Sequence, residues 1–234
     1  MRLFWLLATL IVVLVPGAGR AQPTPVVVEM FTSQGCTSCP PADALLSELA
    51  TQPGVIALAL HVDYWDYLGW EDSFGSPAFS ARQKAYALVF GKRSIFTPQA
   101  VVQGREPMVG HDAEHIRSRI AAHQDEVAPV ELTLDADADV LSIGLAPRGA
   151  PVGQVDVFLV LFTPSAEVSI EAGENAGERI LYTNIVNSWD AVASWDGVEP
   201  VEIAIEIDGL DEADGAVIVQ RGRVGPVMSA ALLP

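Results

Sequence analysis

The sequence predicts a chain of mixed α+β class in two parts, an α/β unit followed by a small antiparallel β-sandwich. In the first part, short apolar runs alternate with helical segments, whereas the second part shows only short alternating runs between Gly, Asp and Pro turns. The charge changes at the same place. Residues 22–124 hold 10 acidic and 7 basic side chains, and residues 125–234 hold 20 and 4. We therefore expect two domains, at residues 22–125 and 126–234.

Residues 1–21 are predicted to be a secretory signal peptide and are excluded from the fold. Arg2 precedes an apolar run at residues 3–15, and small residues lead up to a cleavage point after Ala21. A membrane anchor is the alternative, but the run is shorter than the roughly 20 residues that span a bilayer. We therefore expect a periplasmic or secreted protein, whose cysteines face an oxidising compartment.

Composition excludes several classes of protein. Half of the residues are hydrophobic, so the chain has enough apolar material for a packed core and is not intrinsically disordered. A formal charge of −17 argues against nucleic acids and anionic membrane surfaces as partners. Only two cysteines are present, which excludes a disulfide-rich scaffold and a zinc site of four thiolates.

The first part reads as alternating strands and helices. Its strands are β-branched apolar runs, and its helices carry Pro at the start, Gly91 at an end or Asp112 as a cap. A strand–helix–strand order implies parallel pairing. The predicted elements are strand Val26–Phe31, helix Cys39–Ala50, strand Val55–Val62, helix Pro77–Phe90, strands Gln99–Val102 and Pro107–Val109, and a helix from Asp112 to Ala122.

The second part contains no convincing helix. Its alternating segments fit about seven short antiparallel strands. These are Val130–Leu134, Val140–Leu145, Val155–Phe162, Glu167–Ile170, Arg179–Val186, Val201–Ile207 and Ala216–Gln220.

Cys36 and Cys39 form a C-x-x-C pair between a strand and a helix. Residues i and i+3 lie on one face of a helix start, so the two sulfurs can meet. The unpaired N–H groups of that helix start stabilise a thiolate on Cys36, which we expect to be the exposed nucleophile, with Cys39 resolving the mixed disulfide. A structural disulfide is one alternative, although so short a loop adds little stability. A metal site is another, but two thiolates need further ligands such as His61.

Thr97 and Pro98 are a second candidate feature. Proline just before a strand is usually trans. In this order of elements, however, the loop before the third strand lies beside the cysteine pair. We therefore predict a cis Thr97–Pro98 bond next to Cys36.

On these residues, the segment from Gln22 to His123 resembles the thioredoxin fold. The whole mature chain also resembles a family of secreted bacterial proteins known as domain of unknown function 1223. The resemblance implies a redox role for Cys36 and Cys39, and a role for Thr97-Pro98 in pairing with a substrate strand. Thr37-Ser38 replaces the Gly-Pro of ordinary thioredoxins, so the direction of electron flow stays open. The matching stretches are FTSQGCTSCPPAD, HVDYWDYLGWEDSF, RQKAY, FTPQAVVQGR, EAGENAG and TNIVNSW.

The segment after the second strand adds three weaker candidates. Trp65 and Trp70 are predicted to form a wall for substrate, because ligands gather at the carboxyl ends of strands; the alternative is packing on the following helix. Asp63 is a candidate proton relay, or else a solvated loop residue. Arg82 is expected to be exposed, or to pair with a loop aspartate.

The sequence therefore predicts an exported thiol–disulfide oxidoreductase that acts on protein or small-molecule thiols with the help of a redox partner. No motif indicates an organic cofactor or a resident metal, and no stable membrane span is expected after cleavage. The alternatives are a binding module without turnover and a periplasmic metal carrier that uses the two cysteines. We expect the acidic half to fold separately and not to be needed for the sulfur chemistry.

Overall fold

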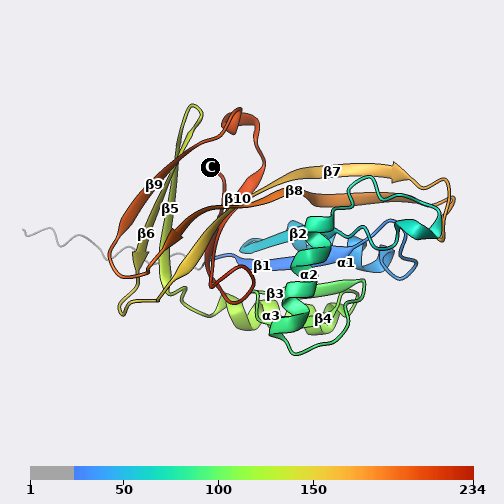
Figure 1. The fold of residues 1–234 in the computed structure, drawn as a ribbon, viewed down its shortest axis with the longest axis horizontal. Helices are drawn as coiled ribbons and strands as arrows, with labels where there is room; N and C mark the ends of the chain where they lie inside the picture. The colour runs from blue at the N-terminus through green and yellow to red at the C-terminus, as the bar shows by residue number, and fades with distance from the viewer. Residues whose placement is uncertain (1–23) are drawn as a thin grey trace, which may run out of the picture.

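A computed structural model describes residues 24–234 (Figure 1). The predicted signal peptide, residues 1–21, lies outside this range. Among the described residues, no helix is both long enough and apolar enough to cross a membrane.

An eight-stranded mixed sheet runs through the molecule in the order β11-β10-β7-β8-β2-β1-β3-β4. Four of its strands come from the first half of the chain and four from the second. Their bounds are β1 Val26–Thr32, β2 Val55–His61, β3 Gln99–Val102, β4 Glu106–Val109, β7 Val155–Ser169, β8 Arg179–Trp195, β10 Gly215–Gln220 and β11 Val227–Leu232.

The predicted elements of the first half are confirmed, each within two residues at either end. The helices are α1 (Pro40–Ala50), α2 (Pro77–Val89) and α3 (Ala113–Gln124). Ser76 accepts a hydrogen bond from Ala78 N at the start of α2, and Asp112 accepts one from His115 N at the start of α3. β1 pairs with β2 in parallel and with β3 in antiparallel orientation, and β3 pairs antiparallel with β4.

The helices cover both faces of this part of the sheet. Leu45 and Leu49 of α1 and Ile116 of α3 pack in one apolar cluster, on the face that Val26 and Val28 of β1 line. The neighbouring β1 residues point the other way, into a second cluster that includes Phe79 and Tyr86 of α2. Because both faces are covered, β1 and β2 are buried along their whole length.

The second half has seven strands, but they differ from the predicted set. Glu167–Ile170 is not a separate strand, since β7 continues to Ser169, and β8 runs on to Trp195. β11 lies outside the predicted set. The remaining strands, β5 (Val130–Asp137), β6 (Val140–Pro147) and β9 (Val201–Glu206), form a three-stranded sheet. An apolar cluster packs this sheet against the start of β7, the end of β8 and strand β10.

The two halves of the chain share the large sheet, a connection that the sequence analysis does not predict. β8 lies beside β2, with Ala59 opposite Ile185 in parallel register. Asn184 Nδ2 donates to Ala57 O at 2.9 Å, and the Ser47 and Thr183 hydroxyls are 2.8 Å apart. In Figure 1 the β7–β8 hairpin extends as a long arm along the α/β part, and its tip lies at the far end from β5, β6 and β9.

A buried ion pair makes a second junction between the halves. Arg82 donates to both carboxylate oxygens of Glu29, at 2.6 and 2.9 Å, and to Gln220 Oε1 at 3.0 Å. Tyr86 Oη donates to Glu29 at 2.5 Å and accepts from Gln220 Nε2 at 2.8 Å. The Arg82 guanidinium also lies 3.7 Å from the centre of the Trp189 ring. The prediction of an exposed Arg82 is wrong, because a buried carboxylate on β1 needs a cationic partner.

Candidate functional site

Cys36 and Cys39 form a disulfide at the start of α1. Their Cα atoms are 5.4 Å apart, and Cys39 is the N-cap residue. Cys39 N donates to Cys36 O at 3.1 Å, and Asp43 N donates to Cys39 O at 3.0 Å. The pair therefore occupies a tight turn that leads directly into the first turn of the helix.

Both sulfur-bearing residues are buried in this oxidised state. Cys39 is fully buried and Cys36 is 3% exposed. The prediction of an exposed Cys36 is therefore wrong for the disulfide form. Ser38 Oγ lies 3.3 Å from Cys36 Sγ, and Trp65 lies against Gly35, the residue before the pair.

The Thr97–Pro98 peptide bond is cis, as predicted from the sequence. Ser38 Oγ donates its proton to Thr97 O at 3.4 Å, and the same oxygen lies in contact with Cys36 Sγ. Trp65 Nε1 donates to the Thr97 hydroxyl at 2.7 Å. The loop before β3 thus lies beside the cysteine turn.

Gln34, two residues before Cys36, anchors the segment between β1 and α1 (residues 33–39), which we call the cysteine loop. It is fully buried, and its polar groups are bonded to two other segments of the chain. From the loop after β2, Trp70 Nε1 donates to Gln34 Oε1 at 2.8 Å, and Asp72 Oδ2 accepts from Gln34 N at 2.8 Å. From the tip of the β7–β8 hairpin, Asn175 Nδ2 donates to Gln34 O at 2.8 Å and to Cys36 O at 3.1 Å.

Asp72 forms a buried pair with His61, the last residue of β2. His61 Nδ1 donates to Asp72 Oδ2 at 2.9 Å, and neither side chain is exposed. Burial alone would raise the pKa of Asp72, but hydrogen bonds from His61 and from the N–H groups of Gln34 and Phe74 outweigh it. The pKa of Asp72 is therefore lowered, and the carboxylate stays ionised.

A group of buried polar atoms lies behind the cysteine loop. Asp43 Oδ2, His61 Nε2 and Tyr182 Oη have no hydrogen-bond partner within residues 24–234. The other oxygen of Asp43 accepts from Thr32 Oγ1 at 2.7 Å. The His61 and Tyr182 rings meet edge to face, with their centres 4.8 Å apart. Burial raises the pKa of Asp43 to about 7, and the opposing effects of His61 and Thr32 are smaller.

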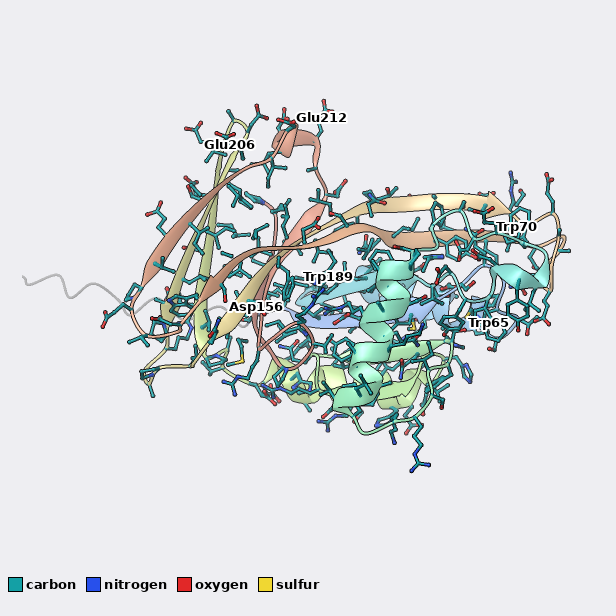
Figure 2. The ribbon with its side chains drawn as sticks, viewed as in Figure 1. Trp65, Trp70, Asp156, Trp189, Glu206 and Glu212 are labelled. Carbon is teal, nitrogen blue, oxygen red and sulfur yellow. A yellow bond between two sulfur atoms is a disulfide. The ribbon has the colours of Figure 1, made fainter. Side chains whose placement is uncertain are left out.

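The weaker sequence candidates lie as follows. Trp65 and Trp70 lie at one end of the molecule in Figure 2, and both indole N–H groups bond to the cysteine loop or the Thr97 loop. Asp63 Oδ1 accepts from Ser80 Oγ at 2.5 Å, and so contacts α2. Whether the two tryptophans contact a substrate stays a prediction.

Sequence reasoning missed Gln34, Asp72 and Asn175 as site residues. Each is polar and stands in a segment that reads as an ordinary turn. Their signal is that all three fall within the stretches that carry the family resemblance, FTSQGC, WEDSF and EAGENAG. Within the part of the chain that the structure describes, no group of three or more His, Cys, Asp or Glu side chains is placed to hold a metal ion.

Residues 27–220 match the family model "Protein of unknown function (DUF1223)". The chain belongs to this family. It is also similar to the crystal structure of protein AGR_C_4864 from Agrobacterium tumefaciens, with 32% sequence identity and a TM-score of 0.79 over 91% of this chain and 96% of the other. No curated protein matches the chain.

A second solved structure, HBP35 of Porphyromonas gingivalis, is similar in fold. Its TM-score is 0.60 at 18% identity, over 90% of this chain and 74% of the other. At that identity the likeness concerns the fold alone.

Proposed function

We propose that this member of the family is an exported thiol–disulfide oxidoreductase with a thioredoxin-like first half, and that Cys36 and Cys39 exchange electrons with protein or small-molecule thiols. The observation that carries the proposal is the closed Cys36–Cys39 pair at the start of α1, with the cis Thr97–Pro98 loop beside it: Ser38 Oγ donates to Thr97 O and lies in contact with Cys36 Sγ. The strand order β2-β1-β3-β4, parallel then antiparallel, supports the thioredoxin-like description.

The exchange runs through Cys36, the less buried of the two residues; because Cys36 is only 3% exposed in the closed pair, attack on its sulfur requires the cysteine turn to open. A substrate thiolate attacks Cys36 Sγ, the Cys36–Cys39 bond breaks, and Cys39 leaves as a thiolate that takes up a proton. A second substrate thiolate attacks the substrate sulfur of the mixed disulfide and releases Cys36. Two electrons pass from the substrate to the pair, and the substrate leaves as a disulfide. The reverse sequence reduces a substrate disulfide. The positive end of the α1 dipole favours thiolate on Cys36. No free N–H group of the helix start does so, because Pro40 and Pro41 lack one and the next two N–H groups bond to Cys39 O.

We propose Asp43 as the group that takes up and returns the proton of Cys39, because its buried carboxyl keeps one oxygen, Oδ2, without a partner among the described residues. It lies one helical turn after Cys39, and its N–H bonds to Cys39 O. Burial raises its pKa to about 7, so the carboxyl changes charge near neutral pH, as a proton carrier must. Asp63, which the sequence suggested for this role, is instead hydrogen-bonded to Ser80.

The test is turnover of a model disulfide with purified protein, together with a thiol count before and after reductant. We expect two thiols to appear on reduction and turnover to be lost in both Cys36→Ser and Cys39→Ser, with mixed disulfides trapped only in Cys39→Ser. A pair that reduces and reoxidises without turnover would favour a binding module. Stoichiometric metal in the reduced protein, lost in both variants, would favour a metal carrier.

Export is tested on the protein recovered from its producing cell. We expect its N-terminus to be Gln22, as cleavage after Ala21 requires. An N-terminus at Met1 in the mature protein would reject the signal peptide.

A further inference from the structure

The tip of the β7–β8 hairpin contributes one side chain to the cysteine loop. Asn175 lies in the acidic half of the chain, 139 residues after Cys36, and its side-chain nitrogen donates to two carbonyl groups of the loop, Gln34 O and Cys36 O. Asn175 is only 7% exposed. A buried amide whose N–H groups are both used in this way fixes the position of the groups that it bonds.

The second of these bonds falls on the turn that joins the two cysteines. Cys36 O also accepts from Cys39 N, the hydrogen bond that closes the turn. Asn175 therefore holds the same peptide group that sets the separation of the two cysteines. Its other acceptor is Gln34 O. The loop after β2 is also hydrogen-bonded to Gln34, through Asp72 and Trp70.

The hairpin tip is itself a closed structure. Gly177 N donates to Ile170 O at 2.7 Å, and Ile170 N donates to Glu178 O at 2.9 Å. Gly173 has a φ of +76°, and a Cβ there would lie 2.9 Å from Trp70 Cβ. Only glycine suits this position, since a side chain would be strained by the φ and would displace Trp70. The tip thus contacts the cysteine loop in two ways. Asn175 bonds to it directly, and Gly173 packs against Trp70, which in turn bonds to Gln34.

We propose that Asn175 is a positioning residue of the dithiol site, and that the acidic half of the chain thereby sets the reactivity of Cys36 and the balance between disulfide and dithiol. This inference rests on the proposed redox function. It is opposite to the expectation that the sulfur chemistry does not need the acidic half. Asparagine is required because it donates from both N–H groups of one nitrogen. An aspartate would place a carboxylate against two carbonyl oxygens, one of them the carbonyl of Cys36 itself.

The test is the equilibrium of the pair with reduced and oxidised glutathione, in which two glutathione thiols give two electrons to Cys36–Cys39 and leave as glutathione disulfide. For Asn175→Ala we expect the equilibrium to move about fivefold toward the dithiol, because the turn that favours the disulfide is no longer held. Asn175→Ser, which keeps one donor, should lie between Asn175→Ala and the wild type, and it replaces Asn175→Ala if that variant does not fold.

Asn175→Asp tests the electrostatic part of the proposal. A carboxylate beside Cys36 raises the pKa of its thiol, so alkylation of the reduced protein at pH 7 should slow by about 3- to 10-fold. The pH profile of alkylation should move upward to match. A role limited to folding would lower the unfolding midpoint without moving this profile.

Asn187 supplies the matched control, because it is exposed on β8 and, among residues 24–234, its side chain bonds only to Thr163. Asn187→Ala and Asn187→Asp should leave both measurements unchanged. If the wild-type pair does not exchange with glutathione, the redox function itself is rejected. If the wild type exchanges and the Asn175 variants match it, or if the Asn187 variants shift equally, the positioning role is rejected and the redox function stands.

Discussion

Two buried polar clusters join the halves of this molecule, and they differ in how completely their atoms are bonded. In the first, Glu29, Arg82, Tyr86 and Gln220 satisfy one another across β1, α2 and β10, although the indole N–H of Trp189, whose ring lies against Arg82, has no partner among the described residues. In the second, Asp43, His61 and Tyr182 of α1, β2 and β8 each keep one atom without a partner among the described residues. A satisfied cluster holds a fold together, whereas unsatisfied polar atoms require a further reason for their burial.

The difference follows the position of the clusters. The second cluster lies behind the cysteine pair, since Asp43 is one helical turn from Cys39, and it includes the carboxyl whose pKa burial raises to about 7. The first lies further along the large sheet, near the middle of the molecule, where Figure 2 labels Trp189. We infer that the first cluster serves stability and that the second serves the chemistry of the dithiol.

The largest effect is expected from breaking the satisfied cluster. Arg82→Met leaves the Glu29 carboxylate buried without its cation, and should lower the free energy of unfolding by about 3–5 kcal/mol. The measurement is urea unfolding of the oxidised protein. The double variant Glu29→Gln/Arg82→Met is the control and should recover part of the loss, because it leaves no unpaired charge. A loss below about 1 kcal/mol in the single variant would show that the pair is not buried in solution.

Asp43→Asn, in the second cluster, is expected to raise the free energy of unfolding, and by less than Arg82→Met lowers it. Because the folded-state pKa is about 7 and the unfolded value is 3.8, folding favours the protonated acid. The wild type should therefore lose stability as the pH rises from about 4 to 7 and stay level above that. The asparagine variant should lack this slope, and at pH 8 should be more stable than the wild type by on the order of 2–4 kcal/mol.

The Asp43 prediction is checked by urea unfolding across that pH range. Ser47→Ala, one turn further along α1, is the control, because it removes a half-buried hydroxyl and no charge; its slope should equal that of the wild type. An unchanged slope in Asp43→Asn would mean that this carboxyl is ionised throughout the range.

The smallest effects come from removing one hydroxyl from each cluster. Tyr86→Phe breaks hydrogen bonds with Glu29, Arg82 and Gln220, and should cost about 1.5–3 kcal/mol. Tyr182→Phe removes a hydroxyl with no partner within residues 24–234, and should change stability by less than about 0.5 kcal/mol. The comparison is direct, because both tyrosines are buried. Equal losses would show that the Tyr182 hydroxyl is also hydrogen-bonded, through a bound water.

Local elements were predictable from the sequence, and long-range contacts were not. The strands and helices of the first half follow from apolar periodicity and caps, which are properties of neighbouring residues. The β2–β8 ladder has a single registered pair, Ala59 and Ile185, supported by side-chain contacts of Thr183 and Asn184, and no local pattern specifies which strand edge another strand will meet. β11 was missed because VMSAAL carries small residues and no alternating polar positions.

The site shows the same limit. Cys36, Cys39 and the cis Thr97–Pro98 bond could be proposed from motifs and the order of elements. Asn175 could not, because an asparagine in a Gly-rich segment reads as a turn residue, and its two acceptors lie in the other half of the chain.

The distance along the chain between Asn175 and the cysteines also separates them in time. A chain grows from its N-terminus at about 5–20 residues per second, so the 139 residues between Cys36 and Asn175 take about 7–28 s to add. During that interval the two cysteines exist without the side chain that finally holds their turn. The hydrogen bonds from Asn175 to the cysteine turn can therefore form only when the β7–β8 hairpin has been completed.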